Sequence, residues 1–576
     1  MMEDLPFVGK KFTWYRADGS AKSRLDRILV SEEWLQVWPM SKQYVQAREV
    51  SDHYAIVVKS WIKDWGPKSF KSIDAWLLEP GFKDLVKDKW MSYEGQGNSI
   101  IKFKDKFKRL KVDLKEWNKN MFGNLENNKR KIMKEIDHLD AKDALCDLME
   151  EDKLRRLELV CQQRVVEKKL ESLYRQKARS NWFKYGDSNS KFYQSTIRWR
   201  RIKNEVKGVE LNDQWCEEPD TVIREAKRVF EDRFKATPDL GVRLGSVDFK
   251  SLPKEVSLKM VEAFSEEEVK ESVWHCEGSK SPGPDGFNFN FIKANWETLK
   301  EDIMEAVRSF HETGSFPKGC NTSFIALVSK VKDPITIDQF RPISLVGAMY
   351  KIITKVMSHR IKGVISMVID ENQSAFMKGR GMFESVVIVN EVIEEVRRNR
   401  KSGVFFKVDF EKAYDSVRWS FLFDMLNKMG FHAKWIKWVQ GCLESATVSV
   451  LVNGCPTEEF RPTRGLRQGD PLAPFLFLIV VEGLAGLVRS ALKENPIRGV
   501  RVGKAEVECC MLQFADDTLL MCEDSYDNIF TIKVILRIFE LASGLKVNFH
   551  KSKLAGIKVG RNSLDIYTRT LNCGAM

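Results

Sequence analysis

Met511-Leu-Gln-Phe-Ala-Asp-Asp-Thr-Leu-Leu-Met-Cys522 places two adjacent carboxylates, Asp516 and Asp517, between two short uncharged apolar runs. This pattern predicts a β-hairpin whose turn carries both acids. Neighbouring Asp side chains repel each other, and a buried pair is unfavourable unless a cation neutralises it. Mg²⁺ prefers such oxygen ligands together with substrate phosphates. The stretch therefore predicts a metal site that handles phosphates; the alternative is a surface turn, where Asp is common.

A third carboxylate ends a second strand of the buried type. Residues Val404–Asp409 finish in an acid and are followed by Phe410-Glu-Lys-Ala-Tyr-Asp415. An acid at the end of a buried strand needs a partner, and we expect Asp409 to join the Asp pair around metal. Two metal ions held by such carboxylates can activate a 3′-hydroxyl and stabilise leaving pyrophosphate. This chemistry depends on positioning and charge rather than on a protein nucleophile.

Two cations are expected near this centre. The strand Phe324–Lys330 ends in a Lys, and the segment Phe340–Leu345 carries Arg341 eleven residues later. An ammonium and a forked guanidinium on a hairpin suit a triphosphate, although surface charge beside a strand would give the same pattern. The Gly- and Pro-rich stretch Arg464–Pro474 predicts a tight loop whose backbone can approach a ligand. Within that loop, Gln468 can hydrogen-bond a sugar or a base.

Several flanking elements can be predicted from local patterns. Ser265 followed by three Glu residues predicts a helix start, and Ser281–Gly286 predicts a rigid turn. Residues Asp527–Leu541 form an amphipathic pattern that ends at Ser543-Gly544, and a strand is expected over Leu545–Phe549.

Composition favours a polyanionic partner inside the cell. The chain has 576 residues, a net charge of +13 and a pI of about 9.0, which favours nucleic acid over membrane. Eleven scattered cysteines fit a reducing compartment. The N-terminus does not resemble a signal peptide, and the apolar run Phe475–Val481, cut by Glu482, is too short to span a bilayer. We therefore expect three or four domains in the cytoplasm or nucleus, without membrane contact.

Residues 1–60 combine short strand patterns with a Ser51-Asp52-His53 triplet. An acid beside an imidazole suits general-base work on a phosphodiester, although a loop with an incidental His is the simpler interpretation. The triplet follows Ser23-Arg-Leu-Asp26-Arg-Ile-Leu-Val30, which supplies another acid.

Residues 61–210 are predicted to be helical and basic. Apolar residues recur at three- and four-residue spacing, and residues 101–210 contain 29 Lys and Arg against 18 Asp and Glu. The region predicts either a solvated helical hairpin or coiled coil, or an arm that follows nucleic-acid phosphates. The aromatic and Arg-rich stretch 178–201 could stack on bases or pack on the next domain. Residues 211–264, with three prolines, predict a linker.

The ordered motifs of residues 265–557 resemble the reverse-transcriptase domain of non-LTR (LINE-type) retrotransposons, especially those of plants. The segments that carry the resemblance are Ser281–Gly286, Phe340–Leu345, Gln373–Phe376, Val408–Asp415, Gly465–Pro474, Phe514–Asp517 and Ser543–Ser552.

The resemblance implies an α+β, right-hand polymerase fold over residues 265–560. Its palm would be an antiparallel sheet with flanking helices and would hold Asp409, Asp516 and Asp517 as catalytic metal ligands. Its fingers would hold Lys330 and Arg341. The nucleotide-binding residues implied in addition are Phe410, Tyr414, Gln468 and Lys551.

Individual roles follow from the same resemblance. Tyr414 matches the aromatic that crowds a ribose 2′-hydroxyl, and Gln468 would lie beside the incoming nucleotide. Lys551 is a candidate proton donor to pyrophosphate, with Lys546 as the alternative. The implied cofactor is Mg²⁺, with Mn²⁺ as a substitute, and the implied partners are an RNA template, a DNA primer or target, and deoxynucleoside triphosphates.

The ends of the chain depart from the family pattern. Residues 1–60 resemble the last strands of the family's apurinic-type endonuclease domain, of the endonuclease/exonuclease/phosphatase fold. Asp26, Asp52 and His53 match acidic and general-base positions, and we expect an inactive remnant. Residues 561–576 are expected to be a truncated end without the thumb. The resemblance thus implies an RNA-directed DNA polymerase weakened by truncation; the alternative is a non-catalytic nucleic-acid-binding remnant with a fossil palm.

Overall fold

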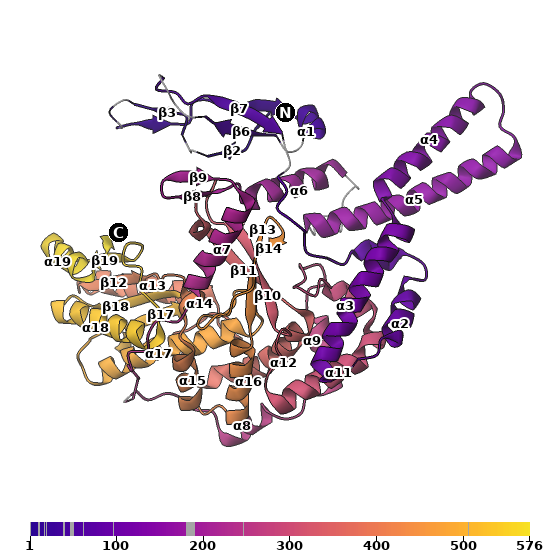
Figure 1. Ribbon diagram of the computed structural model, residues 1–576. Coiled ribbons are helices and arrows are strands. Elements are labelled where there is room, and N and C mark those ends of the chain that lie inside the picture. Colours follow the sequence, from indigo (N-terminus) through magenta and orange to yellow (C-terminus); the bar gives the residue numbers. More distant parts are fainter. Residues whose placement is uncertain are drawn as a thin grey trace.

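The computed structural model describes residues 2–9, 12–16, 18, 20–38, 41–46, 51–60, 63–95, 97–179, 190–245, 247–504 and 506–576. Figure 1 shows a mixed α/β body, a small β module above it and a two-helix arm that projects from it. Residues 180–189, the centre of the aromatic and Arg-rich stretch, lie outside the described residues.

A five-stranded sheet carries the three predicted acids. Its strand order is β17-β18-β12-β19-β20, and all neighbours are antiparallel except β19 and β20. The predicted hairpin is confirmed, because β17 pairs with β18 and Phe514 lies opposite Asp517. The strands are β12 (Gly403–Val408), β17 (Met511–Phe514), β18 (Asp517–Glu523), β19 (Lys553–Ile557) and β20 (Gly574–Ala575).

A four-stranded sheet, ordered β11-β10-β13-β14, carries the two predicted cations. Strands β10 and β11 form the expected antiparallel hairpin, with Val328 opposite Arg341, and β10 also pairs in parallel with β13. Successive side chains alternate between the faces of this sheet. The strands are β10 (Thr322–Ser329), β11 (Phe340–Val346), β13 (Thr447–Val452) and β14 (Cys455–Pro456).

The expected linker over residues 211–264 is wrong. Helix α7 (Pro219–Arg233) has Pro at its first turn and buries Val222, Ala226 and Phe230 against Ile325 and neighbours on the four-stranded sheet. The four-residue spacing of these side chains defines an apolar stripe, and Pro is well tolerated at a helix start. The prolines therefore mark the ends of packed elements here. The other elements of this region are β8 (Val209–Leu211), β9 (Gln214–Cys216) and α8 (Lys254–Lys259).

A long helix, α17 (Ala473–Lys493), runs through the core of the body. Glu482 interrupts the apolar run Phe475–Val481 in the sequence, but it stays within the helix and is 1 % exposed. Its carboxylate accepts a hydrogen bond from the Asp370 backbone N–H at 2.9 Å and pairs with Arg489 at 2.7 Å. By length and composition α17 would suffice to cross a membrane, but its apolar residues lie mostly inside the protein.

The C-terminal part differs from expectation in two places. Helix α18 (Tyr526–Ser543) ends at Gly544 as predicted, with Gly544 in the left-handed region at φ 84°. The strand expected over 545–549 does not form, and Val547 makes one isolated bridge to Phe410. The pairing with β12 is made instead by β19, after a turn in which Ser552 N–H donates to Asn548 O. Residues 561–576 form helix α19 (Arg561–Leu571) and strand β20 against the sheet.

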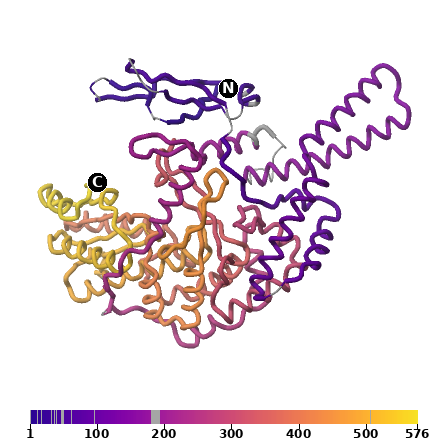
Figure 2. Tube along the Cα trace, in the orientation of Figure 1, coloured from indigo at the N-terminus to yellow at the C-terminus, as the bar shows by residue number. Residues whose placement is uncertain are grey.

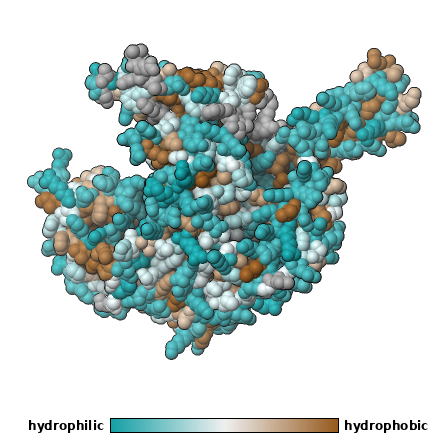
Figure 3. All heavy atoms as spheres, viewed as in Figure 1, coloured by the Kyte–Doolittle hydropathy of each residue, from teal (hydrophilic) through white to brown (hydrophobic). Residues whose placement is uncertain are grey.

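The helical region ends in the projecting arm. Helices α4 (Leu125–Asp143) and α5 (Glu150–Ala178) form an antiparallel hairpin that leaves the body, as Figure 2 shows. Its surface is largely hydrophilic in Figure 3, as expected for a solvated hairpin. The remaining elements of this region are η1 (Asp74–Leu78), α2 (Phe82–Ser92), α3 (Ser99–Trp117), the π-helical turn η2 (Asn118–Phe122) and α6 (Ser190–Asn204).

Further helices surround both sheets and complete the body. They are α9 (Glu266–Trp274), α10 (Phe289–Ala294), α11 (Trp296–Thr313), α12 (Ala348–Val364), α13 (Met382–Arg398), α14 (Ala413–Ser416), α15 (Trp419–Lys428) and α16 (Ala433–Glu444). Short elements between them are η4 (Ile337–Gln339), η5 (Ile365–Met367), β15 (Val500–Val502) and β16 (Val507–Cys509). Ser265 caps α9 as predicted, since its side chain accepts from Glu268 N–H.

The N-terminal module is a set of short strands around a small core of Leu5, Val30 and Leu35. A three-stranded sheet, β2-β6-β7, is its largest part. Its elements are β1 (Met2–Asp4), β2 (Phe7–Val8), β3 (Trp14–Tyr15), β4 (Lys22–Ser23), β5 (Leu29–Ser31), α1 (Glu32–Val37), β6 (Ser41–Val45) and β7 (Ile56–Ser60).

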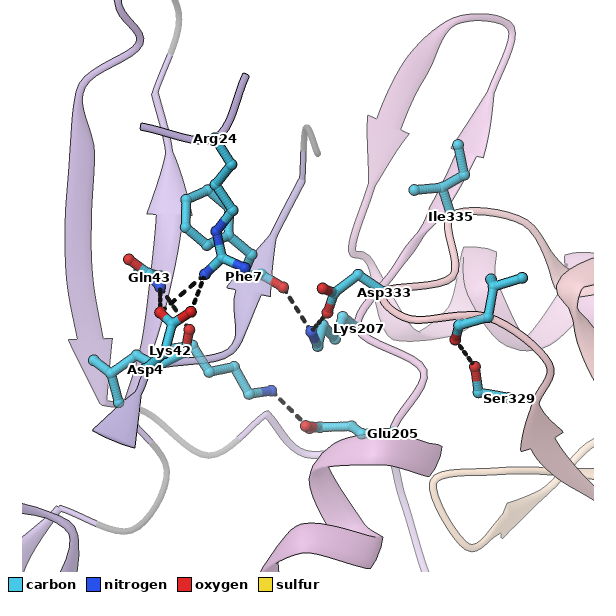
Figure 4. A network of polar contacts seen from close by, with 12 residues as sticks. Asp4, Phe7, Arg24, Lys42, Gln43, Glu205, Lys207, Ser329, Asp333 and Ile335 are labelled. Atoms are coloured by element: carbon cyan, nitrogen blue, oxygen red, sulfur yellow. Dashed lines mark hydrogen bonds and ion pairs between the residues drawn. The ribbon is translucent and has the colours of Figure 1, made fainter. Parts of the chain in front are cut away.

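Polar contacts join this module to the body, as Figure 4 shows. Lys42 pairs with Glu205 at 2.7 Å. Lys207 donates to Phe7 O at 2.6 Å and pairs with Asp333 at 2.7 Å. Since Lys207 and Lys42 are largely shielded from water, these contacts fix the module relative to the four-stranded sheet.

Candidate active site

The five-stranded sheet brings the three predicted acids to one edge. The last pair of the β12–β18 ladder is Val408 opposite Thr518. Asp409 follows Val408 and Asp517 precedes Thr518, so the two acids occupy the next facing positions of an antiparallel pair. Asp516 occupies the turn that joins β17 to β18. The local β-patterns therefore suffice to place three carboxylates at the ends of neighbouring strands.

Among the described residues, the three carboxylates at this edge outnumber the two cations that act on them, Arg341 and Lys407. Desolvation by the surrounding protein raises the pKa of Asp516 although its side chain keeps an exposed edge, and the Asp517 and Asp409 carboxylates raise that pKa further. Arg341 opposes the shift, which places its guanidinium within electrostatic reach of Asp516. Asp517 is paired with Lys407 at 3.5 Å, between two exposed side chains.

The donor chemistry fits a divalent cation. Desolvation and the neighbouring carboxylates raise the pKa of Asp516. Such a group of three carboxylates offers the oxygen ligands that Mg²⁺ and Mn²⁺ prefer. Over the described part of the chain, however, no group of three or more His, Cys, Asp or Glu side chains is arranged closely enough to hold a metal ion. The backbone thus gathers the three acids, while the Asp517 side chain is turned toward Lys407.

A buried amide holds the turn that carries Asp516. Gln373 is 1 % exposed, and its Oε1 accepts hydrogen bonds from the backbone N–H groups of Ala515 and Ala375, each at 3.0 Å. Ala515 has a φ of 56°, in the left-handed region that costs a non-glycine residue free energy. The Gln373 contact stabilises that conformation. The Gln373–Phe376 motif was apparent from the sequence, but its contact with Ala515 spans 142 residues and has no local signal.

The two predicted cations lie on one hairpin but in different surroundings. Lys330 follows β10, and its Nζ donates to Asp338 O at 3.2 Å. Burial lowers its pKa, and the nearby Arg233 and Lys412 lower it further. Arg341 is exposed on β11 and acts electrostatically on Asp516. Of the two, Arg341 is the cation next to the acids.

The Tyr414 side chain lies near the acids, whereas the Phe410 side chain lies in the core. Tyr414 stacks on Phe477, with ring centroids 4.5 Å apart and an interplanar angle of 13°. Burial and the Asp516 carboxylate raise the pKa of Tyr414 to about 12, so its hydroxyl lies near the acids. Phe410 is 7 % exposed and packs edge-on against Phe539. Its ring stabilises the core beneath Asp409.

Gln468 lies in a network that sequence reasoning missed. Its side-chain Nε2 donates to Asp415 Oδ1 at 3.3 Å, and its backbone carbonyl accepts from Ser344 N–H at 2.7 Å. Asp415 is 2 % exposed, and burial raises its pKa to about 6. Arg233, from the helix mistaken for a linker, lies 3.6 Å from Asp415 and provides the counter-charge.

The loop that contains Gln468 is closely packed. Gly465 and Gly469 have φ values of 87° and 103°. A Cβ on Gly465 would lie 2.6 Å from Asp415 O, so a side chain there would displace the Asp415 segment. The loop's close approach is therefore to the protein's own backbone.

The proton-donor candidates remain two. Lys546 and Lys551 are both exposed. The Lys546 carbonyl accepts from Glu411 N–H at 2.8 Å, next to the Asp409 segment, and the Lys551 N–H donates to Asn548 O at 3.1 Å. These backbone contacts place both residues beside the end of β12, and Asn548 N–H donates to Asp409 O at 2.7 Å.

The N-terminal module brings its predicted residues together. His53 Nδ1 lies 2.9 Å from Asp26 Oδ2, and this hydrogen bond is the main cause that lowers the pKa of Asp26. Asp52 accepts from Trp14 Nε1 at 2.7 Å. An acid–imidazole pair is thus present, while Asp52 contacts an indole.

Comparison with known proteins identifies the domain around the acids. Residues 329–560 match the family model described as reverse transcriptase (RNA-dependent DNA polymerase). The chain contains a reverse transcriptase domain. The match includes Asp409, Asp516, Asp517 and the Arg341 strand.

Individual relatives of the reverse transcriptase domain belong to mobile elements. The chain is 25 % identical over 584 residues to the transposon TX1 uncharacterized 149 kDa protein of Xenopus laevis, covering 96 % of this chain and 42 % of that one. It is 27 % identical over 280 residues to the Pol polyprotein of the type-2 retrotransposable element R2DM of Drosophila melanogaster, covering 49 % and 25 %.

A third relative is the RNA-directed DNA polymerase from the mobile element jockey of Drosophila funebris. It is 24 % identical over 356 residues, covering 59 % of this chain and 36 % of the relative. The chain thus spans less than half the length of these curated relatives. The resemblance to non-LTR reverse transcriptases agrees with all three.

Proposed function

We propose that this chain is an RNA-directed DNA polymerase of a LINE-type retroelement, which adds deoxynucleotides to a DNA 3′-hydroxyl on an RNA template. The observation that carries the proposal is the convergence of Asp409, Asp516 and Asp517 at one sheet edge inside a reverse transcriptase domain. In this proposal the five-stranded sheet is the palm, and the four-stranded sheet with α7 forms the fingers. The site of action is intracellular.

The side chains divide the work of positioning and charge. Asp409, Asp516 and Asp517 would hold Mg²⁺ or Mn²⁺, which supplies charge neutralisation at the reacting phosphate. Arg341 binds the triphosphate beside Asp516, and Tyr414 forms the wall against which the sugar rests. Gln468, held by Asp415, orients the nucleotide. Lys551 or Lys546 donates a proton to the leaving pyrophosphate.

The second candidate function is nucleic-acid binding without catalysis. It is favoured by one observation: the Asp517 carboxylate faces Lys407, and the acids do not form a ready ligand group within the described residues. In that case the domain would bind RNA and DNA but incorporate no nucleotide.

Primer extension separates the two candidates. The full chain is supplied with an RNA template, an annealed DNA primer, Mg²⁺ and either deoxy- or ribonucleotides. The polymerase proposal predicts deoxynucleotide incorporation that Asp517→Ala abolishes. RNA affinity should stay within about twofold, because the substitution removes none of the cations that contact phosphates. Preferred ribonucleotide incorporation, or equal activity of Asp517→Ala, would refute the assignment. Binding without incorporation by the parent chain would establish the second candidate.

A further inference from the structure

A large cleft lies between the N-terminal module and the four-stranded sheet, apart from the acids. Its volume is about 1200 Å³, and it is lined by twelve Lys and Arg side chains against four Asp and Glu. Pockets that hold one small ligand have volumes of about 300–1,000 Å³, so this cleft is larger than a site for a single small ligand requires. Cations from six separate chain segments converge on it: β6, residues 63–71, the end of α5, residues 200–207, the turn that contains Lys280, and the start of α12.

Most of these cations lack carboxylate partners. Three of the four acids already contact a Lys: Glu205 pairs with Lys42, Glu217 with Lys63 and Glu277 with Lys280. The fourth accepts a hydrogen bond from a backbone N–H. Among the side chains that the structure describes, eight of the twelve cleft cations make no ion pair to a carboxylate: Lys68, Lys71, Lys177, Arg179, Arg200, Arg201, Lys203 and Lys351.

Like charges are crowded within the cleft. Desolvation by the surrounding protein lowers the pKa of Lys71 although its side chain keeps exposed surface, and the charge of Arg179 lowers that pKa further. Desolvation also lowers the pKa of Arg179, which is likewise exposed in part, and Arg200 adds to the shift. The guanidinium of Arg179 donates to Ser281 Oγ, and that of Arg200 to Ala178 O. These neutral acceptors hold the cations in place without removing their charge, so an anion in the cleft would stabilise the whole group.

The floor of the cleft is apolar and leads toward the acids. Ala326 of β10 faces Ile343 of β11, and both line the cleft. Alternate residues of a strand share one face, so Arg341, two positions before Ile343, lies on the same face. Arg341 is the cation that acts on Asp516. Helix α7 covers the opposite face of the sheet through Ile325 and Leu327. The cleft floor and Arg341 therefore lie on the same face of the β10–β11 hairpin.

We propose that this cleft binds a single strand of RNA, with the N-terminal module serving as one of its walls. Cationic walls track the phosphates of a strand, and an apolar floor with aromatic side chains nearby accepts unpaired bases. Tyr44 and Trp65 line the cleft. A duplex has no need of an apolar floor, because its bases are already stacked. The charge of the cleft indicates that its ligand is a polyanion. The choice of RNA as that polyanion rests on the proposed function.

The module therefore has a role that does not require cleavage. Lys42–Glu205 and the contacts of Lys207 dock it against the body at the edge of the cleft, which Figure 4 shows from close by. The same contacts place Tyr44, two residues after Lys42, on the cleft wall. An RNA strand that enters the cleft must pass between this module and the β10–β11 hairpin.

Fluorescence anisotropy with a labelled 20-nucleotide single-stranded RNA tests the proposal on the full chain, without metal or nucleotides. The cleft variant is Lys68→Glu/Lys71→Glu/Lys203→Glu. The matched control, Lys131→Glu/Lys134→Glu/Lys168→Glu, makes the same charge change on exposed residues of the α4–α5 arm. We expect the cleft variant to bind at least tenfold more weakly, and its slope of log affinity against log salt to fall by about 2, since each lost phosphate contact removes about 0.7. The arm control keeps the parental slope.

The other outcomes decide against the proposal. Unchanged binding in the cleft variant, or equal losses in both variants, would show that the charge acts diffusely over the surface. Tenfold tighter binding of DNA with the same base sequence would overturn the RNA assignment. The corresponding Lys→Gln variants replace the Glu set if the latter fails to fold by circular dichroism. Photo-crosslinks from 4-thiouridine RNA are expected in residues 42–71, and crosslinks confined to other segments would exclude the module as a wall. Because binding is measured without catalysis, loss of RNA affinity stands even if primer extension fails.

Discussion

The Gln373 side chain accepts a hydrogen bond from the Ala515 backbone N–H, 3.0 Å away and 142 residues further along the chain. This contact stabilises the left-handed Ala515 on which the position of Asp516 depends. The turn that carries Asp516 is thus held by a segment of the domain that contains none of the three acids. Gln373 is a positioning residue in this arrangement.

Gln373→Met should lower the turnover of the polymerase and leave its substrate affinity nearly intact. The thioether fills the site but offers only a weak acceptor to Ala515 N–H, and a lost buried hydrogen bond costs about 1–3 kcal/mol. We expect kcat for deoxynucleotide incorporation to fall 10- to 100-fold, with KM changed less than threefold. Gln513→Met is the matched control, because Gln513 is also buried but its amide faces Thr518. Equal kinetic losses in both variants would indicate general damage to the sheet.

Lys407→Met should reduce the Mg²⁺ concentration needed for activity. Lys407 lies 3.5 Å from Asp517 and would compete with the proposed metal ion for its carboxylate. An exposed pair contributes up to about 1 kcal/mol, so half-maximal activity should require two- to fivefold less Mg²⁺. Titrating Mg²⁺ in primer extension measures this shift. A rise in the Mg²⁺ requirement would show that Lys407 orients Asp517 for metal instead.

Tyr414→Ala should increase incorporation of ribonucleotides relative to deoxynucleotides. The Tyr414 ring is fixed by stacking on Phe477 and lies near Asp516, where it would exclude a 2′-hydroxyl. Removing a steric wall is worth about 1–3 kcal/mol, or 10- to 200-fold in discrimination. Tyr414→Phe keeps the ring and should keep the parental preference. The comparison is made by single-nucleotide insertion kinetics, and unchanged discrimination in the Ala variant would remove Tyr414 from this role.

The acids could be predicted from sequence because their signals are local. An apolar run, a turn and a second apolar run define the Asp516–Asp517 hairpin, and Asp409 ends a strand whose apolar pattern is complete. The missed features depend on distant contacts. Gln373 contacts Ala515, which lies far away in the sequence. The strand expected at 545–549 does not form; a turn at Asn548 comes first, and Lys553–Ile557 pairs with β12 instead.

Helix α7 shows how composition misled the interpretation of residues 211–264. Pro219 and Pro253 suggested a linker, but Pro219 begins α7 and Pro253 is the N-cap of α8. The stripe of Val222, Ala226 and Phe230 was present in the sequence at helical spacing. The position of Arg233 beside Asp415 could not be predicted, since it depends on how α7 lies on the sheet.

Arg233→Met should destabilise the protein because it leaves Asp415 buried without a counter-charge. Both side chains are at most 3 % exposed and lie 3.6 Å apart. Breaking a buried pair on one side typically costs about 3–5 kcal/mol. The measurement is the denaturant midpoint followed by tryptophan fluorescence. Arg228→Met on the same helix is the control, since Arg228 is exposed and its ion pairs contribute about 0–1 kcal/mol.

The double variant Arg233→Met/Asp415→Asn should recover most of this loss. Replacing the buried carboxylate by a neutral amide removes the uncompensated charge, while Asn can still contact Gln468. If the double variant is as unstable as Arg233→Met, then the loss comes from the Arg233–Asp338 contact at 2.6 Å rather than from Asp415.

Glu482 should make stability depend on pH between about 4.5 and 7. Burial within α17 is the main cause that raises its pKa from the ordinary 4.5 to about 7 in the folded chain. The folded state therefore binds more protons than the unfolded state in this range, and stability falls as pH rises. The loss corresponds to about 3 kcal/mol at 1.36 kcal/mol per pKa unit.

Glu482→Gln cannot titrate, so its thermal midpoint should vary less than the parent's over this window. Glu297→Gln, an exposed substitution on α11, should keep the parental dependence. If the thermal midpoints of the parent and of Glu482→Gln change by the same amount between pH 4.5 and 7, then Arg489 keeps Glu482 ionised throughout this range.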